Sequence, residues 1–194
     1  MTGDATRISS GSGVSSGFRL RSQTTVWTGQ LFRVTVAEVE APDGDMLQRD
    51  IVRHPGAVGV VPLHDDATVT LVNQYRAALD TTLWEIPAGL RDKDGEAAAV
   101  TARRELGEET GLAAAHLQHL ITFHNSPGAT DEAVDIFLAT DLSPVPDDRQ
   151  GIEEQHMTVQ RLSLSEAIEQ IGDGRITDAK TVIGLLLAQR ALLR

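Results

Sequence analysis

The sequence lacks several residue classes and patterns. None of its 194 residues is cysteine, which excludes disulfides, zinc–thiolate sites and thiol nucleophiles. No run of residues reaches the ~18 apolar positions that a membrane helix requires, and residues 1–17 lack the basic start and apolar centre of a signal peptide. We therefore expect a cytoplasmic protein without a membrane partner, in which any nucleophile is an oxygen of a side chain or of water.

Basic residues are also scarce, with 17 Lys and Arg against 28 Asp and Glu and a net charge of −11. This balance has the wrong sign for binding a phosphate backbone through counterion release, so nucleic acid is not an expected partner. Phosphorylated small molecules stay possible, because bound divalent cations invert the field around a cluster of carboxylates.

The length and the 41% of hydrophobic residues suit one ordinary domain with a modest extra arm. Ser, Thr and Gly dominate residues 1–17, which we expect to form a flexible tail. Residues 18–56 predict a small antiparallel β arm, with strands near 25–28, 31–40 and 46–54 and a turn at 41–45. Residues 57–194 are expected to form the main domain.

The main domain mixes strands and helices. Two apolar strands, 57–63 and 68–75, are separated by His64-Asp65-Asp66 and predict a hairpin. Residues 96–110, rich in Ala, Arg and Glu and followed by Gly111, are the strongest helix candidate. Further strands are expected at 117–123, 134–139 and 157–162, and helices at 165–171 and 178–193. Because most strands precede the helices, the pattern indicates an α+β sandwich.

The predicted helix at 96–110 concentrates negative charge. At about 100° per residue, Glu105, Glu108 and Glu109 fall within roughly 100° of arc. Like charges at i,i+4 cost about 0.2 to 0.5 kcal/mol per pair, and the C-terminal half of a helix repels anions. Arg104 can reach Glu108 but cannot neutralise three carboxylates. The cluster is therefore either a solvated acidic face or a site for Mg²⁺ or Mn²⁺.

The spacing around this helix favours the metal site. Residues 89–112 read GLRDKDGEAAAVTARRELGEETGL, which resembles the signature box of the Nudix hydrolases. The matching positions are Gly89, Glu96, Arg104, Glu105, Leu106, Glu108, Glu109, Gly111 and Leu112. Six residues, where the family pattern has five, lie between Gly89 and Glu96, and Gly95 is either the inserted position or the residue that makes the turn.

The resemblance implies a Nudix-type α/β/α sandwich with a mixed sheet, preceded by the β arm. It also implies that Ala88, Glu105, Glu108 and Glu109 hold Mg²⁺ or Mn²⁺ against a diphosphate, and that Arg104 orients the glutamates by ion pairing. The implied reaction is attack of water on a phosphorus of a nucleoside diphosphate that is linked to another group. Metal-ion chemistry agrees, because such ions offset developing negative charge and activate water.

Segments outside the box resemble the ADP-ribose pyrophosphatase branch of the family. They are Leu83-Trp84-Glu85-Ile86-Pro87-Ala88-Gly89, Gln74-Tyr75-Arg76 and Ser126-Pro127-Gly128. The resemblance implies that Arg76, Trp84, Glu85, Ser126, Pro127 and Gly128 bind the substrate. The plainer alternatives are a surface arginine at a strand end for Arg76, core packing for Trp84 and a solvated carboxylate for Glu85.

A second pair of acidic residues, Glu153 and Glu154, lies in the polar stretch 151–155. By composition this is a charged loop. In the branch that the chain resembles, a glutamate from such a loop moves over the diphosphate and acts as catalytic base or extra ligand. Glu154 is the better match for that role, with Glu153 in reserve, and a mobile loop suits it because closure excludes bulk water.

These features predict metal-dependent hydrolysis of ADP-ribose to AMP and ribose 5-phosphate. Hydrolysis of another nucleoside diphosphate sugar and a catalytically silent ADP-ribose-binding domain are the alternatives. In the resembling branch the β arm exchanges with a second subunit, so we expect a homodimer. The physiological substrate, the preferred metal and its number, and the phosphorus that is attacked stay open.

Overall fold

The chain forms two compact units, an N-terminal unit, Met1–Arg53, and a C-terminal unit, His54–Arg194. The structure, a computed structural model, describes residues 16–146, 148–149 and 151–193. The predicted flexible tail lies outside the described residues up to position 15.

The N-terminal unit is a three-stranded antiparallel sheet in the order β1-β2-β3. Its strands are β1 (Arg19–Thr28), β2 (Arg33–Glu40) and β3 (Met46–Arg53). The turn between β2 and β3 places Gly44 at φ +92°, a conformation that favours glycine. The predicted antiparallel strands are therefore present. β1 begins earlier than predicted, and residues 19–22, in which Leu20 is the one apolar side chain, carry no pattern that predicts a strand.

The C-terminal unit contains a four-stranded sheet in the order β7-β4-β9-β8 and a three-stranded sheet in the order β10-β5-β6. The strands β4 and β9 are parallel, whereas the other pairs are antiparallel. This confirms the predicted mixed sheet. The strands are β4 (Ala57–Pro62), β5 (Thr68–Arg76), β6 (Thr81–Glu85), β7 (Ala88–Leu90), β8 (Leu112–His124), β9 (Ala133–Pro144) and β10 (Thr158–Ser163).

The hairpin expected between β4 and β5 is wrong. These strands belong to different sheets and are linked beside the turn by a single antiparallel bridge between Leu63 and Val69. β5 pairs instead with β6 and with β10, which lies far away in the sequence. Two neighbouring apolar runs predict that strands exist, but the choice of partner depends on long-range contacts that the runs do not encode.

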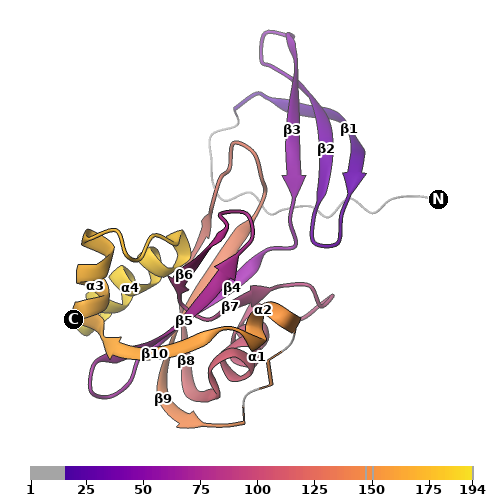
Figure 1. The fold of residues 1–194 in the computed structure, drawn as a ribbon. Coiled ribbons are helices and arrows are strands. Elements are labelled where there is room, and N and C mark those ends of the chain that lie inside the picture. The colour runs from indigo at the N-terminus through magenta and orange to yellow at the C-terminus, as the bar shows by residue number, and fades with distance from the viewer. Residues whose placement is uncertain (1–15, 147, 150, 194) are drawn as a thin grey trace. The chain divides into compact units, whose positions relative to one another are not determined.

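Helices cover both faces of the C-terminal unit (Figure 1). The helix α1 (Ala98–Thr110) packs on the face that carries Val58, Val60 and Phe137. The helices α3 (Leu164–Gly172) and α4 (Ala179–Leu192) pack on the opposite face, against Val61, Ile136 and other alternate residues of the same strands. The layering is that of an α/β/α sandwich, because successive strand residues point to opposite faces.

The helix ends follow local capping. Gly111 ends α1 in the left-handed conformation, at φ 66°, as expected. The start of α1 was predicted two residues too early, because Ala97 is the N-cap and offers no side-chain cap. Ser163 caps α3 and Asp178 caps α4 through their side-chain oxygens. No helix within the described part of the chain is long and apolar enough to cross a membrane.

Candidate active site

The buried face of α1 carries two carboxylates. Glu105 is 7% exposed and Glu109 is 2% exposed, and they share this face with the core residues Ala102 and Leu106. Glu105 and Glu109 are four residues apart, so they lie one helical turn from each other on the same side. The predicted acidic face is therefore packed against the sheet at these two positions and is not a solvated surface.

The strand β7 receives both carboxylates. The backbone N–H of Ala88 donates a hydrogen bond to Glu109 Oε2 at 3.0 Å. A Cβ at Gly89 would lie 2.0 Å from Glu105 Cδ and 2.2 Å from Glu105 Oε1. The matched glycine of the box thus leaves the space that the Glu105 carboxylate fills, because this carboxylate lies directly on the backbone of β7.

Burial makes both carboxyl groups hold their protons more tightly. Burial raises the pKa of Glu105 to about 7, although the charge of Arg104 opposes it. Burial likewise raises the pKa of Glu109 to about 8, against the hydrogen bond from Ala88 and with added repulsion from Glu105 and Glu154. Near neutral pH the site therefore holds protons that a bound cation would displace.

Arg104 is paired with the carboxylates around it. Its Nη1 lies 2.7 Å from Glu105 Oε1 and 2.9 Å from Glu108 Oε2, and its Nη2 lies 3.5 Å from Glu96 Oε2. Glu96 also accepts a hydrogen bond from Thr101 at 2.7 Å, so it joins the cluster despite the additional loop residue. Gly95 adopts φ +76° within that loop and makes the turn that accommodates the residue.

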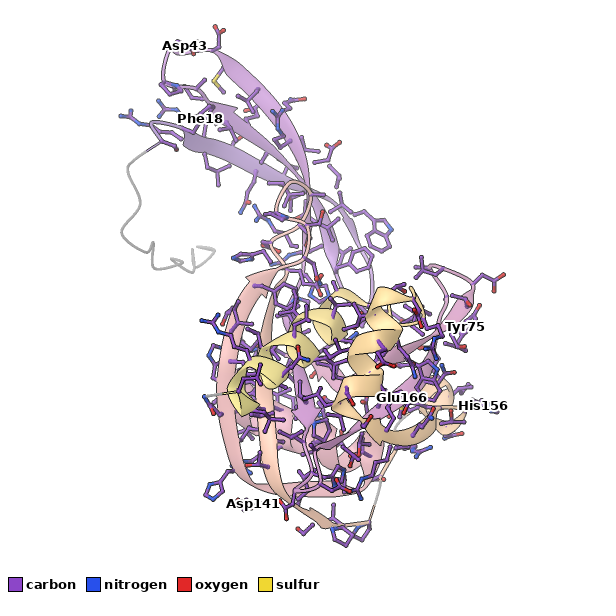
Figure 2. All side chains as sticks on the ribbon, turned by 90° about the vertical axis from the view of Figure 1, so that its left-hand side faces the viewer. Phe18, Asp43, Tyr75, Asp141, His156 and Glu166 are labelled. Atoms are coloured by element: carbon purple, nitrogen blue, oxygen red, sulfur yellow. The ribbon has the colours of Figure 1, made fainter. Side chains whose placement is uncertain are left out.

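The pair Glu153 and Glu154 lies on α2 (Gly151–Gln155), a short helix where the sequence predicted a loop. The charge of Glu154 raises the pKa of both Glu105 and Glu109, whereas Glu153 acts on the hydroxyl of Tyr75. Tyr75 and His156, next to α2, lie on the same side of the C-terminal unit (Figure 2). The charge of Glu154 therefore acts on the carboxylate cluster, whereas that of Glu153 acts on Tyr75 at the end of β5.

Arg76 and Glu85 contact each other. Arg76 Nε and Nη2 donate to Glu85 Oε1 and Oε2 at 2.7 and 2.6 Å, and Lys180 Nζ also donates to Glu85 Oε2. The side chain of Glu85 is 1% exposed, so the sequence alternative of a solvated carboxylate is wrong. The charge of Glu109 contributes to the raised pKa of Arg76, whose largest cause is the hydrogen bond to Glu85. This ion-paired group therefore adjoins the carboxylate cluster.

The remaining residues expected to bind substrate are not joined to this cluster. Trp84 is half-buried and packs against the core beneath α3 and α4. Ser126, Pro127 and Gly128 form an exposed turn in which the Ser126 carbonyl accepts from Ala129 and Thr130. Within the described segments, no hydrogen bond or ion pair links this turn to Glu105 or Glu109. Their substrate contacts stay a prediction.

The sequence analysis missed Lys180, which lies 95 positions from its partner Glu85. The sequence around Lys180 does contain a signal that this lysine has an acidic partner. Asp178 is the N-cap of α4, which places Lys180 in the first turn, where the helix dipole disfavours a cation. A lysine in that position needs a nearby carboxylate, although the sequence could not say which one.

The donor set fits a hard divalent cation. The cluster offers carboxylate oxygens as ligands. Two of its carboxylates, Glu105 and Glu109, are buried close enough to repel each other, and Mg²⁺ or Mn²⁺ would offset that repulsion. As the side chains stand, Arg104 pairs with Glu105 and Glu108, and in the described ranges no three acidic or histidine side chains form a ready ligand group. A cation would bind these carboxylates alongside Arg104, which contacts one oxygen of Glu105 and one of Glu108.

Comparison with known proteins agrees with this geometry. Residues 53–183 match the NUDIX domain. The chain is 38% identical over 164 residues to the ADP-ribose pyrophosphatase of Bacillus subtilis (strain 168), covering 84% of this chain and 88% of that protein. It is 39% identical over 164 residues to the methanol dehydrogenase activator of Bacillus methanolicus, with the same coverage of 84% and 88%.

A solved structure also resembles the chain. A crystal structure of an ADP compounds hydrolase superimposes with a TM-score of 0.76 and 26% identity, covering 91% of this chain and 94% of that one. This confirms the predicted fold.

The glycine beneath Glu105 gives a first test of the cluster. In Gly89→Ala the new methyl displaces the Glu105 carboxylate, which is the movable end of a side chain, so the protein still folds. We expect Mn²⁺ binding, measured by electron paramagnetic resonance, to weaken by about tenfold to 100-fold, the range seen when groups that orient ligands are lost.

The matched control is Gly172→Ala, since a Cβ at Gly172 meets nothing within 4 Å. It should bind Mn²⁺ as the wild type does. A folded Gly89→Ala protein with unchanged Mn²⁺ affinity would remove Glu105 from the ligand set.

The raised pKa of Glu109 predicts how stability depends on pH. The pKa rises from 4.5 to about 8 on folding, so the folded state binds the proton more tightly and the free energy of unfolding falls as pH rises through this window. Without metal, the loss reaches at most about 1.4 kcal/mol per pH unit for this group. Urea unfolding in EDTA between pH 5 and 8 measures it.

Glu109→Gln removes the titrating group without changing the volume of the side chain. Its unfolding free energy should therefore fall less steeply with pH than that of the wild type. Equal slopes for the two proteins would show that Glu109 does not titrate in this window.

Proposed function

The chain belongs to the NUDIX domain family, and from this premise we propose that it hydrolyses ADP-ribose to AMP and ribose 5-phosphate. The observation that carries the proposal is the buried pair Glu105 and Glu109, which α1 places against β7 and on which the charge of Glu154 in α2 acts. The 38% identity to an ADP-ribose pyrophosphatase over most of both chains supports the choice of substrate.

The reaction consumes one water. Its oxygen forms a bond to one phosphorus of the diphosphate, the bridging P–O bond breaks, and the departing phosphate takes the electron pair. The carboxylate of Glu154 would accept the proton of the attacking water, and half-burial on a short helix keeps that carboxylate within reach of solvent. The products are AMP and ribose 5-phosphate.

Nudix hydrolases use divalent metal ions. We propose Mg²⁺ or Mn²⁺ here, held by Glu105, Glu108, Glu109 and the carbonyl of Ala88. When bound, the ion supplies charge stabilisation for the diphosphate and lowers the pKa of water. Arg104 would orient the glutamates, since it already pairs with two of them.

Arg76 is the proposed cationic contact for the diphosphate. Its guanidinium has five N–H groups, and the pairing with Glu85 occupies those on one edge. The other edge keeps the fork geometry that suits phosphate oxygens. For Trp84, Glu85, Ser126, Pro127 and Gly128 the proposed contacts with the nucleoside and ribose rest on the sequence resemblance.

Product identification tests the proposed function. The purified protein is incubated in the presence of Mg²⁺ with one substrate at a time: ADP-ribose, GDP-mannose or another nucleoside diphosphate sugar. The products are identified by mass. We expect AMP and ribose 5-phosphate, at the highest kcat/KM in the panel. If another nucleoside diphosphate sugar is hydrolysed faster, that compound takes the place of ADP-ribose as the proposed substrate. Binding of ADP-ribose without turnover would indicate a catalytically silent domain.

The two glutamates of α2 supply a matched pair of variants. If Glu154 accepts the proton of the attacking water, Glu154→Gln should lower kcat by about 10² to 10⁴-fold with little change in KM. Glu153→Gln, with the same change one position away, should cost less than tenfold because the charge of Glu153 acts on Tyr75. Steady-state kinetics with ADP-ribose at fixed Mg²⁺ measures both.

A Glu154→Gln effect below about tenfold would exclude Glu154 as the base. A larger loss in Glu153→Gln would transfer the role to Glu153.

We propose a homodimer formed through the N-terminal unit. Its sheet exposes large apolar side chains, among them Leu20 (56%), Val26 (59%) and Trp27 (52%). Such surface on a small sheet favours burial against a partner, and a second copy of the chain is the simplest one.

Deletion variants test the dimer. Removal of residues 1–15 should leave a dimer by light scattering, whereas removal of residues 1–53 should give a monomer with little activity. An active monomer after the longer deletion would contradict the proposal.

A further inference from the structure

The group formed by Arg76, Glu85 and Lys180 has a member that the proposed chemistry does not use. We infer that Lys180 is a positioning residue: it holds Glu85, and through Glu85 it fixes the direction in which Arg76 presents its guanidinium to the diphosphate. The inference rests on the proposed function. It adds a residue from the helix on the far face of the sheet.

The contact between Arg76 and Glu85 fixes an orientation. Two parallel hydrogen bonds, 2.7 and 2.6 Å long, hold the guanidinium in the plane of the carboxylate. The direction of Arg76 is therefore set by the rotamer of Glu85. Arg76 itself is about one third exposed, at 36%, so the surroundings of its own side chain do not fix it.

Lys180 in turn fixes Glu85. Its Nζ donates to Glu85 Oε2 and, at 3.0 Å, to Asp178 Oδ1. The side chains of Lys180 and Glu85 are 13% and 1% exposed. A buried carboxylate with two cationic donors has one favourable position, because any other rotamer would leave a charge unpaired away from water.

The backbone that carries Lys180 is itself anchored to the strand. Asp178 Oδ2 accepts from the Thr181 backbone N–H at 3.0 Å and from its hydroxyl at 2.6 Å. Thr181 Oγ1 accepts from the backbone N–H of Ile86, the residue after Glu85, at 2.9 Å. The first turn of α4 is thus bonded both to the side chain of Glu85 and to the backbone beside it.

The position of Lys180 in the helix is unfavourable for stability alone. A cation in the first turn opposes the helix dipole. A buried ion pair gives little net stability compared with apolar residues of similar size. The arrangement is better explained by the orientation that it gives to Glu85 and Arg76 than by its contribution to folding.

The charge of Lys180 also influences the carboxylate cluster. The charge of Lys180 works against the burial that raises the pKa of Glu109. Lys180 therefore lies near the proposed metal site although α4 packs on the opposite face of the sheet from α1.

A double-mutant cycle tests the inference. Lys180→Met, Arg76→Met and the double variant are compared with the wild type by kcat/KM for ADP-ribose, or for the fastest substrate of the panel. We expect Lys180→Met to lose about tenfold to 100-fold, a range typical of lost outer contacts. In the Arg76→Met background the same change should cost less than about twofold, because its target is gone.

The chain offers a matched control. Its other lysine, Lys93, is exposed in the loop before α1, so Lys93→Met removes the same charge and should keep wild-type kcat/KM. Far-ultraviolet circular dichroism and urea unfolding establish that each variant is folded. If Lys180→Met does not fold, Lys180→Gln enters the cycle in its place; because its amide can still donate to Glu85, we expect a smaller loss, which should again disappear in the Arg76→Met background.

The outcomes separate this inference from the proposed function. The wild-type rates with the panel decide the function. If the wild type turns over substrate and the two losses simply multiply, Lys180 acts on the substrate by itself and the inference is wrong. Wild-type activity in folded Lys180→Met would overturn it as well.

Discussion

The arrangement of the C-terminal unit depends on burying two like charges on one helix face. Glu105 and Glu109 lie on the side of α1 that also packs Ala102 and Leu106 against the sheet. Desolvating two carboxylates one turn apart is unfavourable, so the surrounding chain has to offset it. The backbone N–H of Ala88 and the missing side chain at Gly89 are the local adaptations of β7 to this burial.

Positive charge reaches the cluster from different parts of the fold. Arg104 comes from α1 itself and pairs with carboxylates on its own helix. Arg76 comes from the end of β5 and Lys180 from α4, and both are attached to Glu85. Because Glu85 holds these two cations, they stay beside the cluster without neutralising it. At the proposed metal site, the oxygens of Glu105 and Glu109 would thus stay available to a divalent cation.

Sequence alone predicted what local spacing determines. The acidic face of α1, its end at Gly111 and the pairing of Arg104 with Glu108 follow from helical periodicity and are present. What it missed is non-local or lacks a pattern. The pairing of β5 with β10 and the contact of Lys180 with Glu85 join segments about 90 positions apart, and the five residues of α2 are too few to show a period.

The two kinds of carboxylate differ in how firmly they are held, and this difference suits their proposed roles. Glu105 and Glu109 belong to a helix fixed by a packed core, whereas Glu154 is the half-buried residue of a short helix whose Ile152 is 75% exposed. A third carboxylate adds repulsion to a pair that already resists ionisation. Such a group is tolerated most easily on an element that few contacts hold in place. In the proposed mechanism, the same weak attachment would let Glu154 approach once a cation has neutralised the pair, so that the charge required by the reaction would also bring the base into position.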